Sequence, residues 1–162
     1  MQLYVSLGAN IGQREENLHR ALRALEQRVG TLLKCSSFVE TQPVDFDSPN
    51  AFLNAAALFE TSLSAEEILD ITQEIEREIG RTRKSHNGIH YDRCIDIDLL
   101  MLDDQIVNTE RLSLPHPRMT ERLFVLNPLA EIAPELQHPQ IGISVCELLR
   151  RLSEEVPFSP TR

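Results

Sequence analysis

Tryptophan is absent from this chain, cysteine is scarce and positive charge is in short supply. Lysine and arginine number 16 against 25 aspartates and glutamates, so the formal net charge is −9. That balance argues against general affinity for nucleic acid, because any basic footprint would have to be local. Cys35, Cys94 and Cys146 form no CxxC pair, which argues against a disulfide framework or a thiolate zinc site. We expect them to be buried small hydrophobic residues.

Long apolar runs are missing as well. No stretch is long enough to span a bilayer, so a membrane partner is not expected. The first residues also lack a basic segment followed by a long apolar one, so no secretory signal is visible and we expect a cytoplasmic protein. The chain is 162 residues long and 41% apolar, which is enough for a sizeable core, and we predict a single domain over 1–162.

The usual glycine-rich phosphate motifs are absent too. Residues 8–12 read Gly-Ala-Asn-Ile-Gly, which matches neither GxGxxG nor GxxxxGK(S/T). We interpret this segment as a structural turn between a strand over 3–7 and a helix over 13–29. Apolar residues recur at helical spacing through that helix, and Gly30 follows it as a C′ residue.

Periodicity predicts the remaining elements. Strands are expected over 32–41, 52–61 and 95–102. A second helix should start at a capping box formed by Ser64 and Glu67 and run to Ile79.

The later segments are shorter. A tight turn over 103–105 should lead into a hairpin partner over 106–108, and short helices should start near residues 119, 128 and 145. The whole order resembles βαββαβ, a ferredoxin-like α+β core in which two helices pack on an antiparallel sheet, extended here by C-terminal short helices.

The most informative strand carries two aspartates. Alternation places Ile95, Ile97, Leu99 and Met101 on one face and Asp96, Asp98, Leu100 and Leu102 on the other. The α-carbons of Asp96 and Asp98 should lie about 6.6 Å apart on one side, so both carboxylates could share one metal or hold two adjacent metals. Two carboxylates among apolar residues repel each other and lose hydration unless a cation or hydrogen bonds compensate.

Positive charge stands just before this strand, where Arg81, Arg83, Lys84 and Arg93 outweigh Asp92. Arginine presents a planar fork that fits phosphate oxygens, and lysine adds a point charge. Paired aspartates beside such donors suit a magnesium-bound polyphosphate. The other interpretation is a solvated basic loop with which the aspartates simply pair, and the pattern leaves both open.

Other polar positions also allow two interpretations. Asn54, near the start of its strand, marks a place where a ligand approaches the sheet, or it ends a turn. Gln73 and Glu76, one helical turn apart, either border the site or are solvated. His116 stands between two prolines and is therefore held in place, either for a ligand or to cap a neighbouring carbonyl.

Taken together, several segments resemble the 6-hydroxymethyl-7,8-dihydropterin pyrophosphokinase family of the folate pathway. The resemblance covers nearly the whole chain and is specific in its combination of RxR, DxD and PHP. It is carried by residues 8–12, 52–56, 73–76, 80–84, 93–99 and 114–119, with Arg122 and Phe124. It implies transfer of a pyrophosphoryl group from ATP to the pterin hydroxymethyl group, with release of AMP, by a single pyrophosphokinase domain.

The resemblance also implies a nucleotide site. Asp96 and Asp98 would bind two Mg²⁺ ions that bridge the ATP phosphates, with Arg83 and Arg93 as further catalytic residues. Asp98 is also a candidate to accept the proton of the substrate hydroxyl. The residues expected to contact ATP are Gln73, Glu76, Arg83, Lys84, Arg93, Leu99, Leu112, Ser113, His116 and Arg122.

A pterin site is implied on the same grounds. The ring would stack between Phe52 and Phe124, since a flat heterocycle suits two aromatic faces. Asn54 would read a donor and acceptor edge of the ring. Asp96 would lie near this substrate as well, and the backbone around Thr41, Pro43 and Val44 would complete the hydrogen bonds.

The chain departs from the family between Lys84 and Arg93. Family members commonly carry a tryptophan there in an RWGPR-like run, and this chain has none. The loop is expected to act as a lid over ATP, with Asn87-Gly88 favouring movement. Tyr91 or His90 are the candidates to replace the missing ring.

Two other classes of protein compete with this interpretation. A magnesium-dependent phosphohydrolase or nuclease would also use paired aspartates, but it should need further carboxylates and a water-activating group. A noncatalytic regulator would bind ATP without consuming it. The resemblance names two kinds of candidate partner: the small-molecule substrates and other folate-pathway enzymes.

Overall fold

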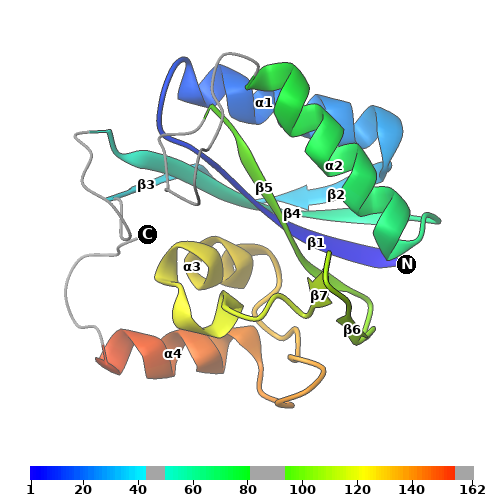
Figure 1. Ribbon diagram of the computed structural model, residues 1–162. Coiled ribbons are helices and arrows are strands. Elements are labelled where there is room, and N and C mark those ends of the chain that lie inside the picture. Colours follow the sequence, from blue (N-terminus) through cyan, green and yellow to red (C-terminus); the bar gives the residue numbers. More distant parts are fainter. Residues whose placement is uncertain (43–49, 81–93, 156–162) are drawn as a thin grey trace.

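A central antiparallel sheet with helices on both faces organises the molecule (Figure 1). The computed structural model describes residues 1–42, 50–80 and 94–155. The main sheet has the strand order β2-β4-β1-β5, and β3 also pairs with β4. Its strands are β1 (Gln2–Ala9), β2 (Gly30–Cys35), β3 (Val39–Thr41), β4 (Phe52–Thr61) and β5 (Asp96–Leu102).

Two helices, α1 (Arg14–Arg28) and α2 (Ala65–Ile79), cover one face of this sheet, and α3 (Leu123–Ile132) covers the other with α4 (Val145–Glu155) outside it. The remaining elements are β6 (Val107–Asn108), β7 (Ser113–Leu114) and the 3-10 helix η1 (Met119–Glu121). The expected ferredoxin-like βαββαβ core is confirmed, because β1, α1, β2, β4, α2 and β5 follow in that order in one antiparallel sheet.

Alternation along the central strands builds two separate cores. From β1, Leu3, Val5 and Leu7 pack under α1 and α2, while Tyr4 packs toward α3. Both faces of β1 are buried because it lies between β4 and β5 and has helices above and below. The predicted capping box is also present: Ser64 Oγ accepts the Glu67 N–H, and the Glu67 side chain accepts the Ser64 N–H.

Alternation fails within β5. Tyr4 pairs with Met101 and Val5 with Leu99, so Leu100 is an extra residue in the strand. Leu100 and Met101 both join the core under α3, and Leu102 returns to the core under α1 and α2. The predicted faces of Met101 and Leu102 were therefore wrong. The aspartates precede the bulge and keep their predicted face.

The single strand expected over 32–41 is two strands. Ser36 interrupts it: its N–H donates to the carbonyl of Ala56, and its hydroxyl accepts the Ala56 N–H at 2.9 Å. A side-chain oxygen thus replaces a ladder acceptor, and the chain starts again as β3.

The hairpin expected after β5 does not form. After the turn at Asp103, β6 pairs with β7 instead of with β5. The Asp103 side chain accepts the Gln2 N–H at 2.7 Å, and the Asp103 N–H donates to the Gln2 carbonyl. This exchange ties the turn to the start of β1.

Two smaller expectations were also wrong. Pro128 lies inside α3 and does not start a new helix. Burial of α3 on both sides, against the sheet and against α4, outweighs the hydrogen bond that proline removes. The cysteines are not buried, since Cys35 and Cys146 are exposed and Cys94 is half-buried. Across the described ranges, every helix is too short or too polar to cross a membrane.

Candidate functional site

The two aspartates lie on the face of β5 that looks toward α3. Ile97 and Leu99 are buried under α1 and α2, so the pleat sends Asp96 and Asp98 to the opposite side. Both carboxylate residues are half-buried, and they pair with Gly8 and Ser6 of β1. The predicted shared face is confirmed.

Asn54 lies in the same cross-strand row as Asp96. Gly8 pairs with Asn54 on one side and with Asp96 on the other. Strands are spaced by about 4.8 Å, which puts the α-carbons of Asn54 and Asp96 about 10 Å apart. Gly8 has only a hydrogen in place of a side chain, so no side chain of β1 separates the amide of Asn54 from the carboxylate of Asp96 in this row.

The Asn54 side chain is fully buried and its orientation is fixed. Its Nδ2 donates to Thr41 Oγ1 at 2.6 Å and to the Val39 carbonyl at 3.3 Å, both on β3. These bonds assign the amide nitrogen toward β3.

Two aromatic rings belong to the same region. Phe52 precedes Asn54 by two residues, pairs with Thr41 and is 4% exposed. Phe124 is the second residue of α3, the helix over this face, and is 3% exposed. The guanidinium carbon of Arg122 lies 5.4 Å from the Phe124 ring centroid, which is cation–π distance. The sheet and the helix each supply one predicted ring.

His116 lies beside β5. The main-chain N–H of His116 donates to the Leu100 carbonyl at 2.8 Å, at the bulge in β5. Burial, reinforced by the positive charge of Arg122 and opposed by Asp96, lowers the pKa of His116 to about 4. Its Nδ1 accepts the Arg118 N–H at 3.1 Å, so we assign the proton of the neutral ring to Nε2.

A groove of about 270 Å³ follows the outer edge of β5. Five of its lining residues were predicted to contact ATP or metal: Asp98, Leu99, Leu112, Ser113 and His116. The other lining residues were not predicted to contact a ligand; they are Leu69, Ile97, Thr109, Glu110, Arg111 and Pro117. Arg111 forms ion pairs with Glu66 at 3.0 Å and Asp70 at 2.6 Å, which joins the segment between β6 and β7 to α2.

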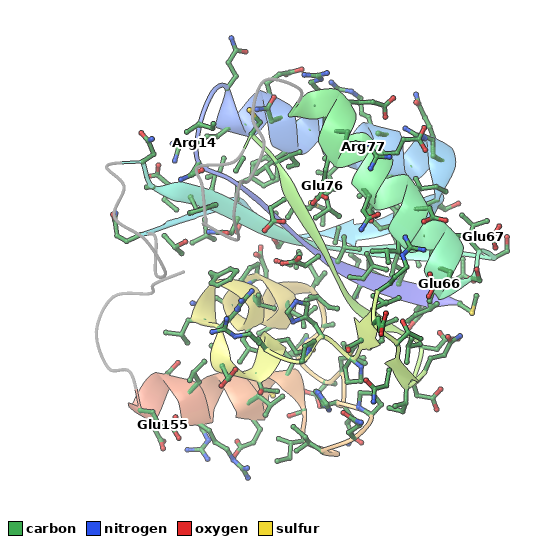
Figure 2. All side chains as sticks on the ribbon, in the orientation of Figure 1. Arg14, Glu66, Glu67, Glu76, Arg77 and Glu155 are labelled. Atoms are coloured by element: carbon green, nitrogen blue, oxygen red, sulfur yellow. The ribbon has the colours of Figure 1, made fainter. Side chains whose placement is uncertain are left out.

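Glu76 reaches β5 from α2 (Figure 2). Its Oε2 accepts the Ile97 N–H at 2.7 Å. Gln73, three residues earlier on α2, is exposed. Of these two candidates, Glu76 is the one that the structure brings to the aspartate strand.

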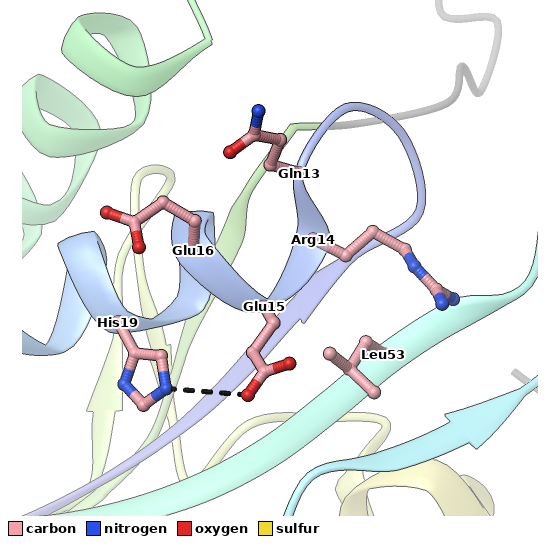
Figure 3. Close-up of a pocket in the computed structure, with 6 residues that line it drawn as sticks. All are labelled: Gln13, Arg14, Glu15, Glu16, His19 and Leu53. Carbon is pink, nitrogen blue, oxygen red and sulfur yellow. Dashed lines mark ion pairs between the residues drawn. The ribbon is translucent and has the colours of Figure 1, made fainter.

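A second hollow, of about 540 Å³, lies beside α1 (Figure 3). It is lined by Gln13, Arg14, Glu15, Glu16, His19 and Leu53, and none of these is a predicted site residue. Arg14 is engaged with the Ala51 carbonyl at 2.9 Å and with Glu40 at 2.6 Å. His19 is exposed, 3.9 Å from Glu15, as expected for a histidine on the wet side of the helix.

Several predicted residues lie outside the described ranges: Arg83, Lys84, Arg93, Pro43 and Val44. The same holds for the proposed lid residues His90 and Tyr91. Among the residues that are described, no three or more histidine, cysteine, aspartate or glutamate side chains gather as a metal site.

Comparisons with known proteins agree on one family. The family model described as 7,8-dihydro-6-hydroxymethylpterin-pyrophosphokinase (HPPK) matches residues 4–134. A 2-amino-4-hydroxy-6-hydroxymethyldihydropteridine pyrophosphokinase of Porphyromonas gingivalis is 49% identical over 139 residues, which cover 85% of this chain and 94% of the relative. The protein of the same name from Bacillus subtilis is 46% identical over 135 residues, covering 83% and 79%.

Solved structures show the same fold. The chain superposes on wild-type Plasmodium falciparum HPPK-DHPS with pteroate at a TM-score of 0.76 and 14% identity. The match covers 99% of this chain and 46% of that one, so the present chain spans less than half of the HPPK-DHPS protein. At this identity the likeness concerns the fold alone.

Proposed function

The chain belongs to the 7,8-dihydro-6-hydroxymethylpterin-pyrophosphokinase family, and from that premise we propose how its residues share the work of the reaction. The enzyme transfers pyrophosphate from ATP to the hydroxymethyl group of 6-hydroxymethyl-7,8-dihydropterin, releasing AMP, in folate biosynthesis. One observation carries the proposal: a buried amide and two carboxylates stand on one face of the sheet, and a groove borders the same strand.

We assign the pterin site to the row formed by Asn54, Gly8 and Asp96, beside which Thr41 holds the Asn54 amide from β3. Phe52 and Phe124 stack on the ring, because a flat heterocycle presents two π-faces. Asn54 binds an edge of the ring through its Oδ1, because its Nδ2 already donates to Thr41 and to the Val39 carbonyl on β3. The backbone near Pro43 and Val44 completes this site.

The nucleotide site is the groove at the outer edge of β5. Because the Ile97 N–H points outward to Glu76, the alternation of an antiparallel pair directs the Leu99 N–H to the same edge. Adenine binds there, against the main chain of Leu99 and of Leu112 to Ser113. Gln73 and Glu76 border the nucleotide from α2.

The phosphates extend from this groove toward the aspartates. His116 donates from Nε2 to a phosphate oxygen, and in the ligand-free protein its pKa of about 4 leaves the ring uncharged near pH 7. Arg122 supplies positive charge, together with Arg83, Lys84 and Arg93.

Asp96 and Asp98 fit a magnesium site by the chemistry of their donors. They offer hard oxygen ligands on one strand face, and Mg²⁺ usually takes one or two carboxylates and completes its shell with water and substrate phosphates. Two protein ligands are therefore enough, and we propose that the pair holds two Mg²⁺ ions. When bound, the ions neutralise the charge of the phosphates.

The side chains of the protein position the pterin substrate and stabilise the charge that develops on the leaving AMP. Phe52, Phe124 and Asn54 aim the hydroxymethyl oxygen at the β-phosphorus, and Asp98 accepts the proton of that hydroxyl. As the bond from the β-phosphorus to the AMP oxygen breaks, Arg83 and Arg93 stabilise the developing charge. No covalent intermediate with the protein is required.

Nucleotide chromatography tests this assignment. The purified chain is incubated with ATP and Mg²⁺, with and without the pterin alcohol, beside Asp98→Asn and Asn54→Ala variants. AMP should accumulate only with the pterin, and both variants should lower its rate. Release of ADP or AMP without pterin would identify a phosphohydrolase, and ATP left intact with pterin present would identify a binding protein.

The setting of the enzyme is also part of the proposal. We place it in the cytoplasm as a single pyrophosphokinase domain over 1–162. The three cysteines are free, as suits a reducing compartment. Other folate-pathway enzymes are proposed as partners, because HPPK is joined to DHPS in the Plasmodium falciparum protein.

A further inference from the structure

Two helix side chains hold the backbone at the start of β5. From α1, Asn17 Nδ2 donates to the Cys94 carbonyl at 3.2 Å. From α2, Glu76 Oε2 accepts the Ile97 N–H at 2.7 Å. These two contacts bracket Asp96, and Ile97 itself lies between the two aspartates. We call Asn17 and Glu76 the β5 anchors.

This segment needs such support because β5 is an edge strand of the main sheet in the part of the chain that the structure describes. Within those residues, β1 pairs with one side of β5 and no strand of the main sheet pairs with the other. On the outer side, the His116 N–H bonds the Leu100 carbonyl, which lies beyond the aspartates. At the aspartates themselves, the outward N–H of Ile97 is taken up by Glu76. Glu76 therefore acts at the edge of β5 opposite β1, and Asn17 acts at Cys94, just before Asp96, the first residue of β5 that pairs with β1.

Both anchors stand on firmly packed helices. Asn17 is 8% exposed and adjoins Leu18, which is fully buried in the core under α1. Glu76 is half-buried and adjoins Ile75, which is 1% exposed in the same core. When a side chain on a packed helix forms a hydrogen bond with the main chain of a strand, the strand is held in a fixed place relative to the helix. The bond from Glu76 is also charge-assisted, which makes it the stronger of the two.

From this geometry we infer that Asn17 and Glu76 are positioning residues that hold Asp96 and Asp98 in the arrangement a divalent cation requires. They act through the main chain of Cys94 and Ile97 and contact neither cation nor substrate in this role. The inference rests on the proposed metal-binding role of the aspartates. It gives Glu76 a task beyond bordering the nucleotide, and it adds Asn17, which no sequence motif marked.

Direct cation binding tests the inference without turnover. Mn²⁺ serves as the probe, free Mn²⁺ is measured by electron paramagnetic resonance, and a nonhydrolysable ATP analogue is present throughout. Because lost support around metal ligands typically costs ten- to a hundredfold in affinity, Glu76→Ala and Asn17→Ala should weaken Mn²⁺ binding by at least about tenfold. Asn17→Asp, equal in size but without the N–H donor, should do the same.

Rescue separates positioning from charge. In Glu76→Gln the amide oxygen can still accept the Ile97 N–H, so Mn²⁺ affinity should stay within about threefold of wild type. Glu74→Gln removes a charge from the same helix at its surface ion pair with Arg28 and serves as the matched control, with affinity unchanged. Melting temperatures identify any variant that fails to fold, and the Asn17 and Glu76 variants test the inference independently.

Several outcomes contradict the inference. Wild-type Mn²⁺ affinity in folded Glu76→Ala and Asn17→Ala would show that the anchors do not position the aspartates. A loss in Glu76→Gln equal to that in Glu76→Ala would assign Glu76 an electrostatic role instead. If the wild-type protein itself bound no Mn²⁺ with the analogue, the proposed metal site would fail first, and this inference with it.

Discussion

Replacing Thr41 by valine should separate the support of Asn54 from its contact with the pterin. Thr41 is 5% exposed, and its Oγ1 accepts from Asn54 Nδ2 at 2.6 Å. Valine has nearly the same shape without the hydroxyl, so Nδ2 keeps only the longer bond to the Val39 carbonyl at 3.3 Å. Serine at the same position keeps the hydroxyl and provides the matched control.

The magnitude follows from burial. A buried polar group that loses a partner costs about 1–3 kcal/mol, so Thr41→Val should lower the free energy of unfolding by that amount in urea. The Asn54 amide is then held less well, and if this costs about 1 kcal/mol of the binding free energy, the Kd for the pterin alcohol should rise about fivefold. Thr41→Ser should change both quantities by less than half as much.

Two measurements decide the outcome: urea unfolding and calorimetric titration with the pterin alcohol. A Thr41→Val protein with the stability and pterin affinity of wild type would refute the role given to this hydrogen bond. Equal losses in the valine and serine variants would point to the lost methyl packing or volume change and away from the hydroxyl.

Three further predictions address other parts of the chain. Arg93→Ala should lower kcat by at least about tenfold with the melting temperature unchanged, since an arginine on transition-state charge is lost, and an unchanged steady-state rate would remove this residue from the mechanism. His116 has a pKa of about 4 in the folded protein against 6.5 in the unfolded chain, so the unfolded chain binds one more proton between these two pH values. The unfolding free energy of the ligand-free protein should therefore fall as the pH drops from 6.5 to 4, by up to about 3 kcal/mol. A His116→Gln variant with the same pH slope would contradict this. Ser64→Ala removes the N-cap of α2 and should cost about 1 kcal/mol in urea unfolding without changing the KM for pterin, whereas Ser64→Asp should keep most of the stability.

The sequence was sufficient to predict features that depend on local side-chain alternation and helix capping. The alternation around Ile97 put both aspartates on one face, and Ser64 and Glu67 marked the start of α2 correctly. These features depend on neighbours within a few residues, which is the range over which a pattern carries structural information.

Features that depend on contacts between residues far apart in the sequence could not be predicted from it. The bulge at Leu100 is a matter of pairing with β1, and the departure of the chain at Asp103 depends on its exchange of hydrogen bonds with Gln2. Asn17 looked like any polar residue on a helix, and its bond to the Cys94 carbonyl arises only when α1 packs on the sheet. The groove along β5 likewise includes Arg111, whose partners lie on α2.

The central claim is that Asp96 and Asp98 hold the divalent cations that carry the triphosphate of ATP. Crystals grown with Mn²⁺, a nonhydrolysable ATP analogue and the pterin alcohol would test it by anomalous scattering. We expect manganese peaks within coordination distance of both carboxylates, with phosphate oxygens completing the shells. Manganese bound elsewhere, with both carboxylates occupied only by arginine or lysine side chains, would contradict it.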